Sequence, residues 1–294
     1  MIPSKIPAPI AAALLALITA ATGSAMNCLI RLVSAELHPF EIGFFRNVFG
    51  CLAILPFALR QGLPALRPQR PGRIVYAAVV NVFSMLSFFS AVALLPLNDL
   101  TALSFTTPLF QTIGAAILLG EVVRRSRWMA SAVGFLGVLI IARPGTDAFS
   151  TGSLLVLFGA SAYAAVSLII KSIAARENAY AVVLYVSGLM SCLSLGPALF
   201  MWTTPSPSAL WMMALIGALG TTGWLAFAQA FKLADASALA PYDFMRLPFI
   251  AAPAYLVFGE VPDLWTWIGA AVIFTSSLAM THLETRGARK PRSL

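Results

Sequence analysis

The chain has 294 residues, of which 60% are hydrophobic and only 10% are charged. A soluble domain carries about 25% charged residues, so this composition excludes a chain that folds wholly in water and predicts an all-α integral membrane protein. The net charge of +8 does not indicate nucleic-acid binding, because the Lys and Arg residues stand in short segments between apolar runs, where they orient membrane helices.

The chain offers few ligands for a metal or a cofactor. Cys28, Cys51 and Cys192 lie inside apolar runs and form no CxxC pair, and only two histidines are present. That pattern is not typical of a disulfide framework, a zinc site or a haem site. We therefore predict no metal site, no cofactor and no nucleic-acid partner.

Five apolar runs make up the first half, each close to the roughly 20 residues that cross a bilayer. They are expected at residues 8–33, 40–59, 74–95, 100–119 and 128–142. The first run is too long for the apolar centre of a cleaved signal peptide, so we interpret it as a spanning helix. In the second run, Arg46 lies about 9 Å from the start, where it can snorkel to the surface or point into a cavity. In the fourth run, Pro108 removes a backbone hydrogen bond and predicts a kink at mid-membrane.

Five further runs make up the second half. They are expected at residues 150–170, 179–202, 209–231, 237–260 and 264–282. The eighth run holds Gly217, Gly220 and Gly223, which favour close helix packing over a hinge. The ninth holds Asp243 and Arg246, which are three residues apart and therefore share one helix face. Ionisable side chains are expensive in a spanning helix and usually line a polar pathway or pair with each other.

The distribution of basic residues predicts the orientation of the bundle. If the N-terminus is cytoplasmic, every Lys and Arg falls in a cytoplasmic loop or tail except Arg31, Arg46, Arg143 and Arg246. Cytoplasmic segments of membrane proteins carry such an excess of positive charge. We therefore predict that both termini lie in the cytoplasm and that the chain crosses the inner (plasma) membrane ten times.

The two halves look like copies of each other. A Gly-Glu pair ends an apolar run at 120–121 and again at 259–260, and a Trp-bearing run follows each pair. Because five is odd, two five-helix copies in one chain must enter the membrane from opposite sides. Inverted repeats are a recurring plan of secondary transporters, whose substrate site lies near the midplane between the halves. We predict one repeat at 1–145, a second at 146–284 and a basic cytoplasmic tail at 285–294.

The repeated motif resembles that of a known family. The run PLF at 108–110 leads to Gly-Glu at 120–121, and RLPF at 246–249 leads to Gly-Glu at 259–260, with the second proline one residue closer to its Gly-Glu. This pattern is similar to the EamA-type branch of the drug/metabolite transporter (DMT) superfamily over essentially the whole chain. The resemblance implies a central cavity lined by helices 1, 3, 4, 6, 8 and 9, and it is nearest to the amino-acid exporters of that branch.

The candidate site residues are the polar and aromatic side chains of those helices. They are Asn27, Asn81, Gln111, Tyr163, Trp224, Tyr242 and Arg246. Arg246 can hold a carboxylate, or it can form a structural pair with Asp243. Helix packing is the alternative role for the neutral polar residues. Asp243 and Arg46 are candidates for coupling or gating, and the two Gly-Glu pairs are expected to cap or anchor helix ends.

The predicted function is secondary transport of a small metabolite by alternating access, and in particular efflux of amino acids, aromatic ones included. Transport of drugs, of a riboflavin-like vitamin or of nucleotide-linked metabolites stays open. The chain has no Walker A sequence and no catalytic set, which argues against an ATP-driven pump and an intramembrane enzyme, and a channel is a further alternative. The expected partners are the lipid bilayer and a small-molecule substrate. A monomer is compatible with this plan, and the sequence does not specify an oligomeric state.

Overall fold

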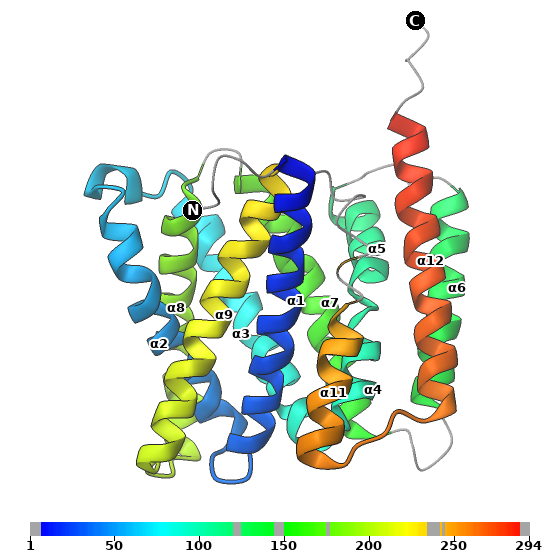
Figure 1. Ribbon diagram of the computed structural model, residues 1–294. Helices are drawn as coiled ribbons and strands as arrows, with labels where there is room; N and C mark the ends of the chain where they lie inside the picture. The colour runs from blue at the N-terminus through cyan, green and yellow to red at the C-terminus, as the bar shows by residue number, and fades with distance from the viewer. Residues whose placement is uncertain are drawn as a thin grey trace, which may run out of the picture.

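The computed structural model describes residues 7–119, 125–143, 150–174, 177–233, 242 and 245–288. All regular structure in that part of the chain is helical. The helices are α1 (Ala8–Val33), α2 (Pro39–Leu59), the 3-10 turn η1 (Leu63–Leu66), α3 (Pro71–Leu94), α4 (Leu97–Ser104), α5 (Thr107–Leu119), α6 (Arg125–Ala142), α7 (Thr151–Ala174), α8 (Ala179–Phe200), α9 (Pro207–Leu233), α11 (Arg246–Phe258) and α12 (Leu264–Ala288). They run side by side in one bundle (Figure 1).

Six of these helices are long and apolar enough to cross a membrane. Their candidate spans are Ile10–Val33, Pro39–Leu59, Pro71–Leu94, Thr151–Ile170, Ala179–Phe200 and Pro207–Phe227. Shorter apolar segments lie in α6, α11 and α12. The protein is therefore a multi-pass membrane protein. The start of α1 and the end of α12 lie at one end of the bundle, called here the terminal face, and the α1–α2 and α11–α12 connections lie at the opposite face (Figure 1).

Local sequence sets several helix starts. Proline is the first residue of α2, α3 and α9, where its missing N–H costs nothing because the first helical N–H groups have no partner within the helix. At α2 the imidazole of His38 accepts the N–H of Phe40 at 3.3 Å, and the Glu41 carboxylate accepts the N–H of His38 at 3.2 Å. These two bonds form a capping box, so the first turn of α2 is defined by the residues next to it.

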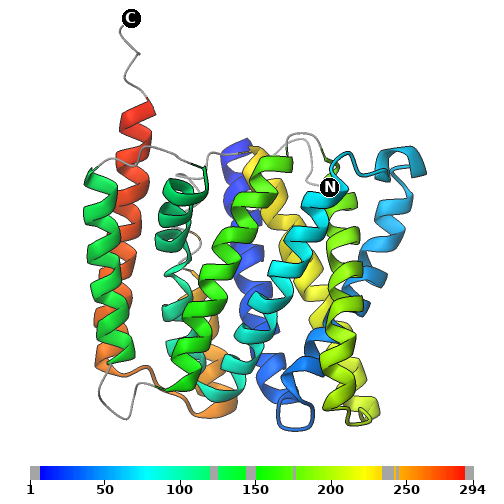
Figure 2. The same cartoon turned by 180° about the vertical axis from the view of Figure 1, so that it is seen from behind.

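The main helix contacts fall into matching pairs. Helix α1 packs on α9 as α7 packs on α3, α2 meets α9 as α8 meets α3, and α5 meets α7 as α11 meets α1. The matching follows from pairing the helices of the two halves in chain order: α1 with α7, α2 with α8, α3 with α9, α5 with α11 and α6 with α12. When each helix is replaced by its partner, each of these contacts becomes the other contact of its pair. Two contacts, α2 with α8 and α6 with α12, map onto themselves under this exchange. The α6–α12 pair forms one edge of the bundle, as the view from behind also shows (Figure 2).

The helix predicted at 100–119, with a kink from Pro108, is interrupted at Phe105 and Thr106, so the kink is a full break into α4 and α5. Residue 108 is proline and has no N–H for the carbonyl of Ser104. The Thr107 hydroxyl donates to that carbonyl at 2.8 Å, and the Thr106 hydroxyl donates to the carbonyl of Leu103, also at 2.8 Å. Backbone groups inside a membrane must be satisfied within the protein, and these two hydroxyls allow the break.

The predicted ninth helix is described only from its second part. Helix α11 has 13 residues and ends before Gly259-Glu260. Gly259 closes α11 in a left-handed conformation with φ +66, which glycine adopts without steric cost. The remaining predicted spans agree with the structure apart from shifts at their ends; α6 begins at Arg125 and α12 continues to Ala288.

The glycines of α9 form a packing surface, as their spacing predicted. A Cβ at Gly217 would lie 2.6 Å from the Cβ of Phe49 and 2.8 Å from the backbone nitrogen of Gly50. The backbones of α9 and α2 therefore approach so closely that only glycine fits at this point. A Cβ at Gly223 would lie 2.7 Å from the Thr22 hydroxyl, so the same row of glycines also packs against α1.

Candidate functional site

Arg46 of α2 points into the bundle, which decides between the two orientations that the sequence allowed. Its Nη1 donates to the side-chain oxygen of Asn47 at 2.8 Å. Its Nε is enclosed and has no hydrogen-bond partner among the described residues. No carboxylate in the described part of the chain forms an ion pair with this guanidinium. A fixed positive charge inside the membrane without a carboxylate is a marker of a functional site.

Three helices surround the Arg46 guanidinium. Gly220 of α9 lies directly against it, because a Cβ there would lie 3.0 Å from Nη2 and 3.2 Å from Nε. The same Cβ would lie 3.2 Å from the sulfur of Met26 on α1. The phenol of Tyr163 on α7 is close enough to interact electrostatically with the guanidinium. Residues from both halves of the chain therefore meet at Arg46.

Asn47 is a site residue that the sequence prediction missed. It is fully buried, and its amide nitrogen donates to the carbonyl of Gly43 at 2.8 Å and contacts the sulfur of Met85 at 3.1 Å. These contacts hold the amide oxygen toward Arg46. The only signal in the sequence was an amide beside an arginine inside an apolar run.

Asn27 and Arg246 come close through the contact of α1 with α11. The Ser24 hydroxyl donates to the backbone carbonyl of Arg246 at 3.3 Å. Asn27 follows Ser24 by three residues, so it lies on nearly the same face of α1. Its amide oxygen is buried and has no hydrogen-bond partner among the described residues. Arg246 is the first residue of α11 and is half-buried; Asp243, its predicted partner, lies outside the described residues.

The other predicted residues are distributed over separate helix contacts. The Gln111 amide donates to the Ser167 hydroxyl at 2.8 Å across α5 and α7, and the Asn81 amide contacts the Met190 sulfur at 3.3 Å across α3 and α8. Helix packing therefore accounts for the contacts of these two amides. Trp224 and Tyr242 are half-buried, and Tyr163 is 39% exposed.

Glu260 joins three segments at the opposite face. Its carboxylate accepts the N–H of Leu97, the first residue of α4, at 2.7 Å and lies 3.5 Å from a guanidinium nitrogen of Arg31. Arg31 also donates to the carbonyls of Val92 and Leu95 at the end of α3. This confirms the expectation that Glu260 anchors a helix end; Glu121 of the first Gly-Glu pair lies outside the described residues.

Other carboxylates hold the same face together. Glu36 accepts the N–H and the hydroxyl of Ser206, and Glu41 accepts the N–H of Thr203. Further along the face, Asp99 accepts the hydroxyl of Thr266 and Asp263 pairs with Arg143. Each bond connects segments more than 100 residues apart, so the opposite face is closed by a ring of interhelical hydrogen bonds.

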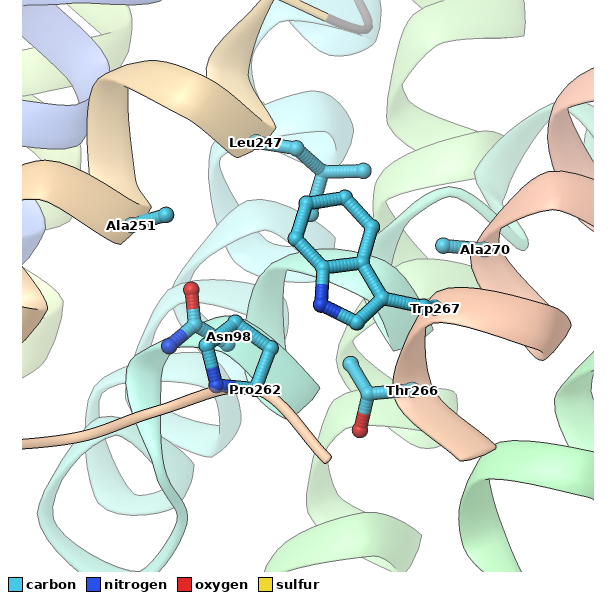
Figure 3. Close-up of a pocket in the computed structure, with 7 residues that line it drawn as sticks. All are labelled: Asn98, Leu247, Ala251, Pro262, Thr266, Trp267 and Ala270. Carbon is cyan, nitrogen blue, oxygen red and sulfur yellow. The ribbon is translucent and has the colours of Figure 1, made fainter. Parts of the chain in front are cut away.

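A small pocket lies where α4, α11 and α12 meet (Figure 3). It is lined by Asn98, Leu247, Ala251, Pro262, Thr266, Trp267 and Ala270. Asn98 is 2% exposed, and neither atom of its amide has a hydrogen-bond partner among the described residues. The space that a water molecule's centre can occupy is about 10 Å³, which suits one ordered water and no metabolite.

A second pocket of about 260 Å³ lies at the opposite face, between the α3–α4 corner and the α6–α7 corner. Its charged lining residues are Asp99 and Arg143. Both side chains already have partners: Asp99 accepts the Thr266 hydroxyl, and Arg143 forms an ion pair with Asp263. Their charges are therefore less available to a ligand than the charge of Arg46. The described residues contain no group of three or more His, Cys, Asp or Glu side chains placed to hold a metal ion.

Comparison with known proteins identifies the family. The model of the EamA-like transporter family matches twice, at residues 10–143 and 150–281. The chain is 31% identical to an S-adenosylmethionine uptake transporter of Rickettsia prowazekii, over 93% of this chain and 92% of that protein. It is 33% identical to a riboflavin transporter of Vibrio cholerae over 86% of each chain, and 29% identical to the pseudopaline exporter CntI of Pseudomonas aeruginosa over 92% of this chain and 96% of that one.

A crystal structure that is 17% identical superposes with a TM-score of 0.63, covering 94% of this chain and 99% of that one, and so shows a common fold. The named relatives are transporters of different metabolites, and they include both uptake and export proteins. With two family matches that together span almost all of its residues, the chain belongs to the EamA-like transporter family of the DMT superfamily.

Proposed function

We propose that this protein is a secondary transporter that moves a small metabolite across the inner (plasma) membrane by alternating access. The observation that carries the proposal is the Arg46 guanidinium, which is enclosed between helices of both halves and has no carboxylate partner among the described residues. A carrier needs such a polar group at the interface of its two halves, because the substrate binds there and the halves rock around it.

We further propose that the chain forms ten spans in two inverted repeats, residues 1–145 and 146–284. The matching helix contacts support this arrangement, since α1–α9, α2–α9 and α1–α11 have their counterparts in α3–α7, α3–α8 and α5–α7. The charges support cytoplasmic termini, because the α2–α3 connection at the terminal face carries Arg60, Arg67 and Arg70.

The proposed substrate is a metabolite that carries an amino-acid group, with S-adenosylmethionine first and free amino acids, aromatic ones included, next. The relatives named for S-adenosylmethionine uptake support this choice, because they align over 93% of the chain. Riboflavin is the second candidate, favoured by the 33% identity to the Vibrio cholerae transporter. The relatives include uptake and export proteins, so the amino-acid efflux expected from the sequence becomes one direction of a reversible carrier in this proposal.

The proposed substrate site keeps the residues expected from the sequence and adds two. The members are Asn27, Asn81, Gln111, Tyr163, Trp224, Tyr242 and Arg246, with Arg46 and Asn47 beside them. Arg46 and Asn47 form its best-supported part, because the Arg46 guanidinium donates to the Asn47 amide and lies against Gly220 of the other half. Asp243 is proposed as a proton-coupling group, so Asp243→Asn should abolish flux driven by a pH gradient while counterflow persists; unchanged coupling in that variant would remove Asp243 from the mechanism.

The test is counterflow into liposomes that contain the purified protein. Liposomes are loaded with unlabelled S-adenosylmethionine, methionine, phenylalanine, riboflavin or buffer, and entry of the labelled compound is followed with and without a pH gradient. Faster entry into loaded than into empty liposomes, with saturation, is expected for one class and distinguishes a carrier from a channel. Entry no faster than into protein-free liposomes, for all four compounds, would refute the proposed substrates.

A further inference from the structure

The described arginines inside or at the ends of the bundle differ in how their charge is balanced. Arg31 lies beside the Glu260 carboxylate, and Arg143 pairs with Asp263. Arg46 has no carboxylate partner among the described residues, and its hydrogen-bond partner there is the uncharged amide of Asn47. An arginine side chain stays protonated in proteins, so burial cannot remove this charge. Leaving it without a counter-charge inside a membrane is costly, and such a group is retained where a ligand supplies the opposite charge.

The three nitrogens of Arg46 have different surroundings. Nη1 donates to Asn47, and Nε is enclosed without a partner. Nη2 lies against Gly220 and is not among the enclosed nitrogens, so it is the part of the guanidinium that remains open. The open Nη2 belongs to the planar guanidinium fork, whose geometry matches the two oxygens of a carboxylate.

The neighbours hold this fork in place. Asn47 is fixed by the Gly43 carbonyl and the Met85 sulfur, so it holds Nη1 in one orientation. Gly220 leaves the room that Nη2 occupies, because any larger residue would press on the guanidinium. A guanidinium that is positioned but unpaired loses little side-chain entropy when an anion binds.

We propose that Arg46 binds the carboxylate of the transported metabolite and thereby selects substrates that carry an anionic group. This inference rests on the transporter function proposed above and assigns the substrate class of that site. It favours S-adenosylmethionine and amino acids, whose carboxylates are ionised at neutral pH, over riboflavin, which has no ionised group there. The counter-charge for Arg46 arrives with the substrate, so the loaded carrier has a neutralised centre when its halves rearrange.

The experiment uses pairs of compounds that differ in one carboxylate. Counterflow into liposomes is measured for S-adenosylmethionine and its decarboxylated form, and for methionine and methioninol, with the full-length protein. The wild type should have a half-saturation concentration about 10- to 100-fold lower for the carboxylate member of a pair, as expected for a charge-assisted hydrogen bond. Excess phosphate or chloride is added in parallel; if either removes the preference, the site takes an inorganic anion and the inference fails.

Two variants test the residue assignment. Arg46→Gln keeps a polar side chain but removes the charge, and Asn47→Asp supplies a carboxylate at the oxygen that already accepts Nη1. Both should reduce the preference to about one-fold, while the decarboxylated compound still exchanges and so reports a folded carrier. Gly188→Ala is the matched control, since its methyl group would meet only the Cys51 sulfur at 3.7 Å; it should keep the wild-type preference.

The outcomes separate this inference from the proposed function. Equal transport of both members of a pair, or a preference that survives in Arg46→Gln, would overturn the role of Arg46 and leave the carrier intact. Exchange of riboflavin but of neither pair would do the same. If nothing is transported, ligand-induced shifts of the melting temperature decide: stabilisation by the carboxylate member in the wild type and not in Arg46→Gln supports the inference, and no difference overturns it.

Discussion

Replacing Gly217 with alanine should separate two helices that now touch through their backbones. The new methyl group would lie 2.6 Å from the Cβ of Phe49 and 2.8 Å from the nitrogen of Gly50. Non-bonded carbon atoms rest about 3.5–4.0 Å apart, so α9 must move away from α2 by about 1 Å. Overpacking of this kind costs about 1–3 kcal/mol, and alanine recovers about 0.5–1 kcal/mol as the better helix former. The expected net loss of stability is about 1–2 kcal/mol.

The assay is thermal unfolding of the purified protein in detergent, followed by intrinsic fluorescence. For a chain of this size, about 1 kcal/mol corresponds to roughly 2–4 °C, so Gly217→Ala should lower the apparent melting temperature by about 3–6 °C. Gly23→Ala in α1 is the matched control, because no atom lies within 4 Å of its added methyl group. The control should melt at or slightly above the wild type. If the two variants melt together, the close α2–α9 approach does not stabilise the protein and the reasoning fails.

Three further predictions concern other contacts. Gly220→Ala should keep the melting temperature, because its methyl group meets the flexible ends of the Arg46 and Met26 side chains, but should raise the half-saturation concentration of a carboxylate substrate about 3- to 10-fold; unchanged transport would contradict it. Glu260→Ala should lose about 1–2 kcal/mol in thermal unfolding, with Glu260→Gln intermediate; equal loss in both would assign the effect to packing. Thr107→Val should lose about 1 kcal/mol relative to Thr107→Ser, which keeps the donor to the Ser104 carbonyl; equal stability would contradict it.

The site was only partly predictable, and Arg46 shows why. A residue about 9 Å into a helix is near enough to the surface to snorkel, so its position along the chain left both orientations open. The choice depends on Gly220, which is more than 100 residues away and makes room for the guanidinium. Asn47 was missed for the same reason, since its role follows from the neighbour it orients.

Gln111 and Asn81 illustrate the reverse case. Both are amides in apolar runs, and in the sequence such an amide looks the same as one that lines a cavity. In the structure each has a partner on a neighbouring helix, Ser167 in one case and Met190 in the other. An amide in a spanning helix needs a partner whatever its role, so polarity alone does not separate packing from binding.

The sequence by itself determined the properties that depend on nearby residues. Long apolar runs define membrane helices, because the bilayer core demands about 20 apolar residues and satisfied backbone groups. Prolines and capping residues define helix starts, and the repeated Gly-Glu pairs revealed two copies of one unit. The apolar runs and the helix starts depend on residues within a few turns of the chain, and the repeat is a comparison of two short motifs. All three can therefore be recognised without knowing which helices pack together.

Only the tertiary structure decided which polar groups meet. It broke the fourth helix where the Thr107 hydroxyl donates to the Ser104 carbonyl in place of the bond that Pro108 removes, and it joined Glu260 to Leu97 and Arg31. It also left Arg46 without a carboxylate among the described residues while Arg31 and Arg143 each have one. Such pairings join residues far apart in sequence, and they arise because burying a charge or a backbone group in a low-dielectric interior is affordable only when the packed helices bring its partner to it.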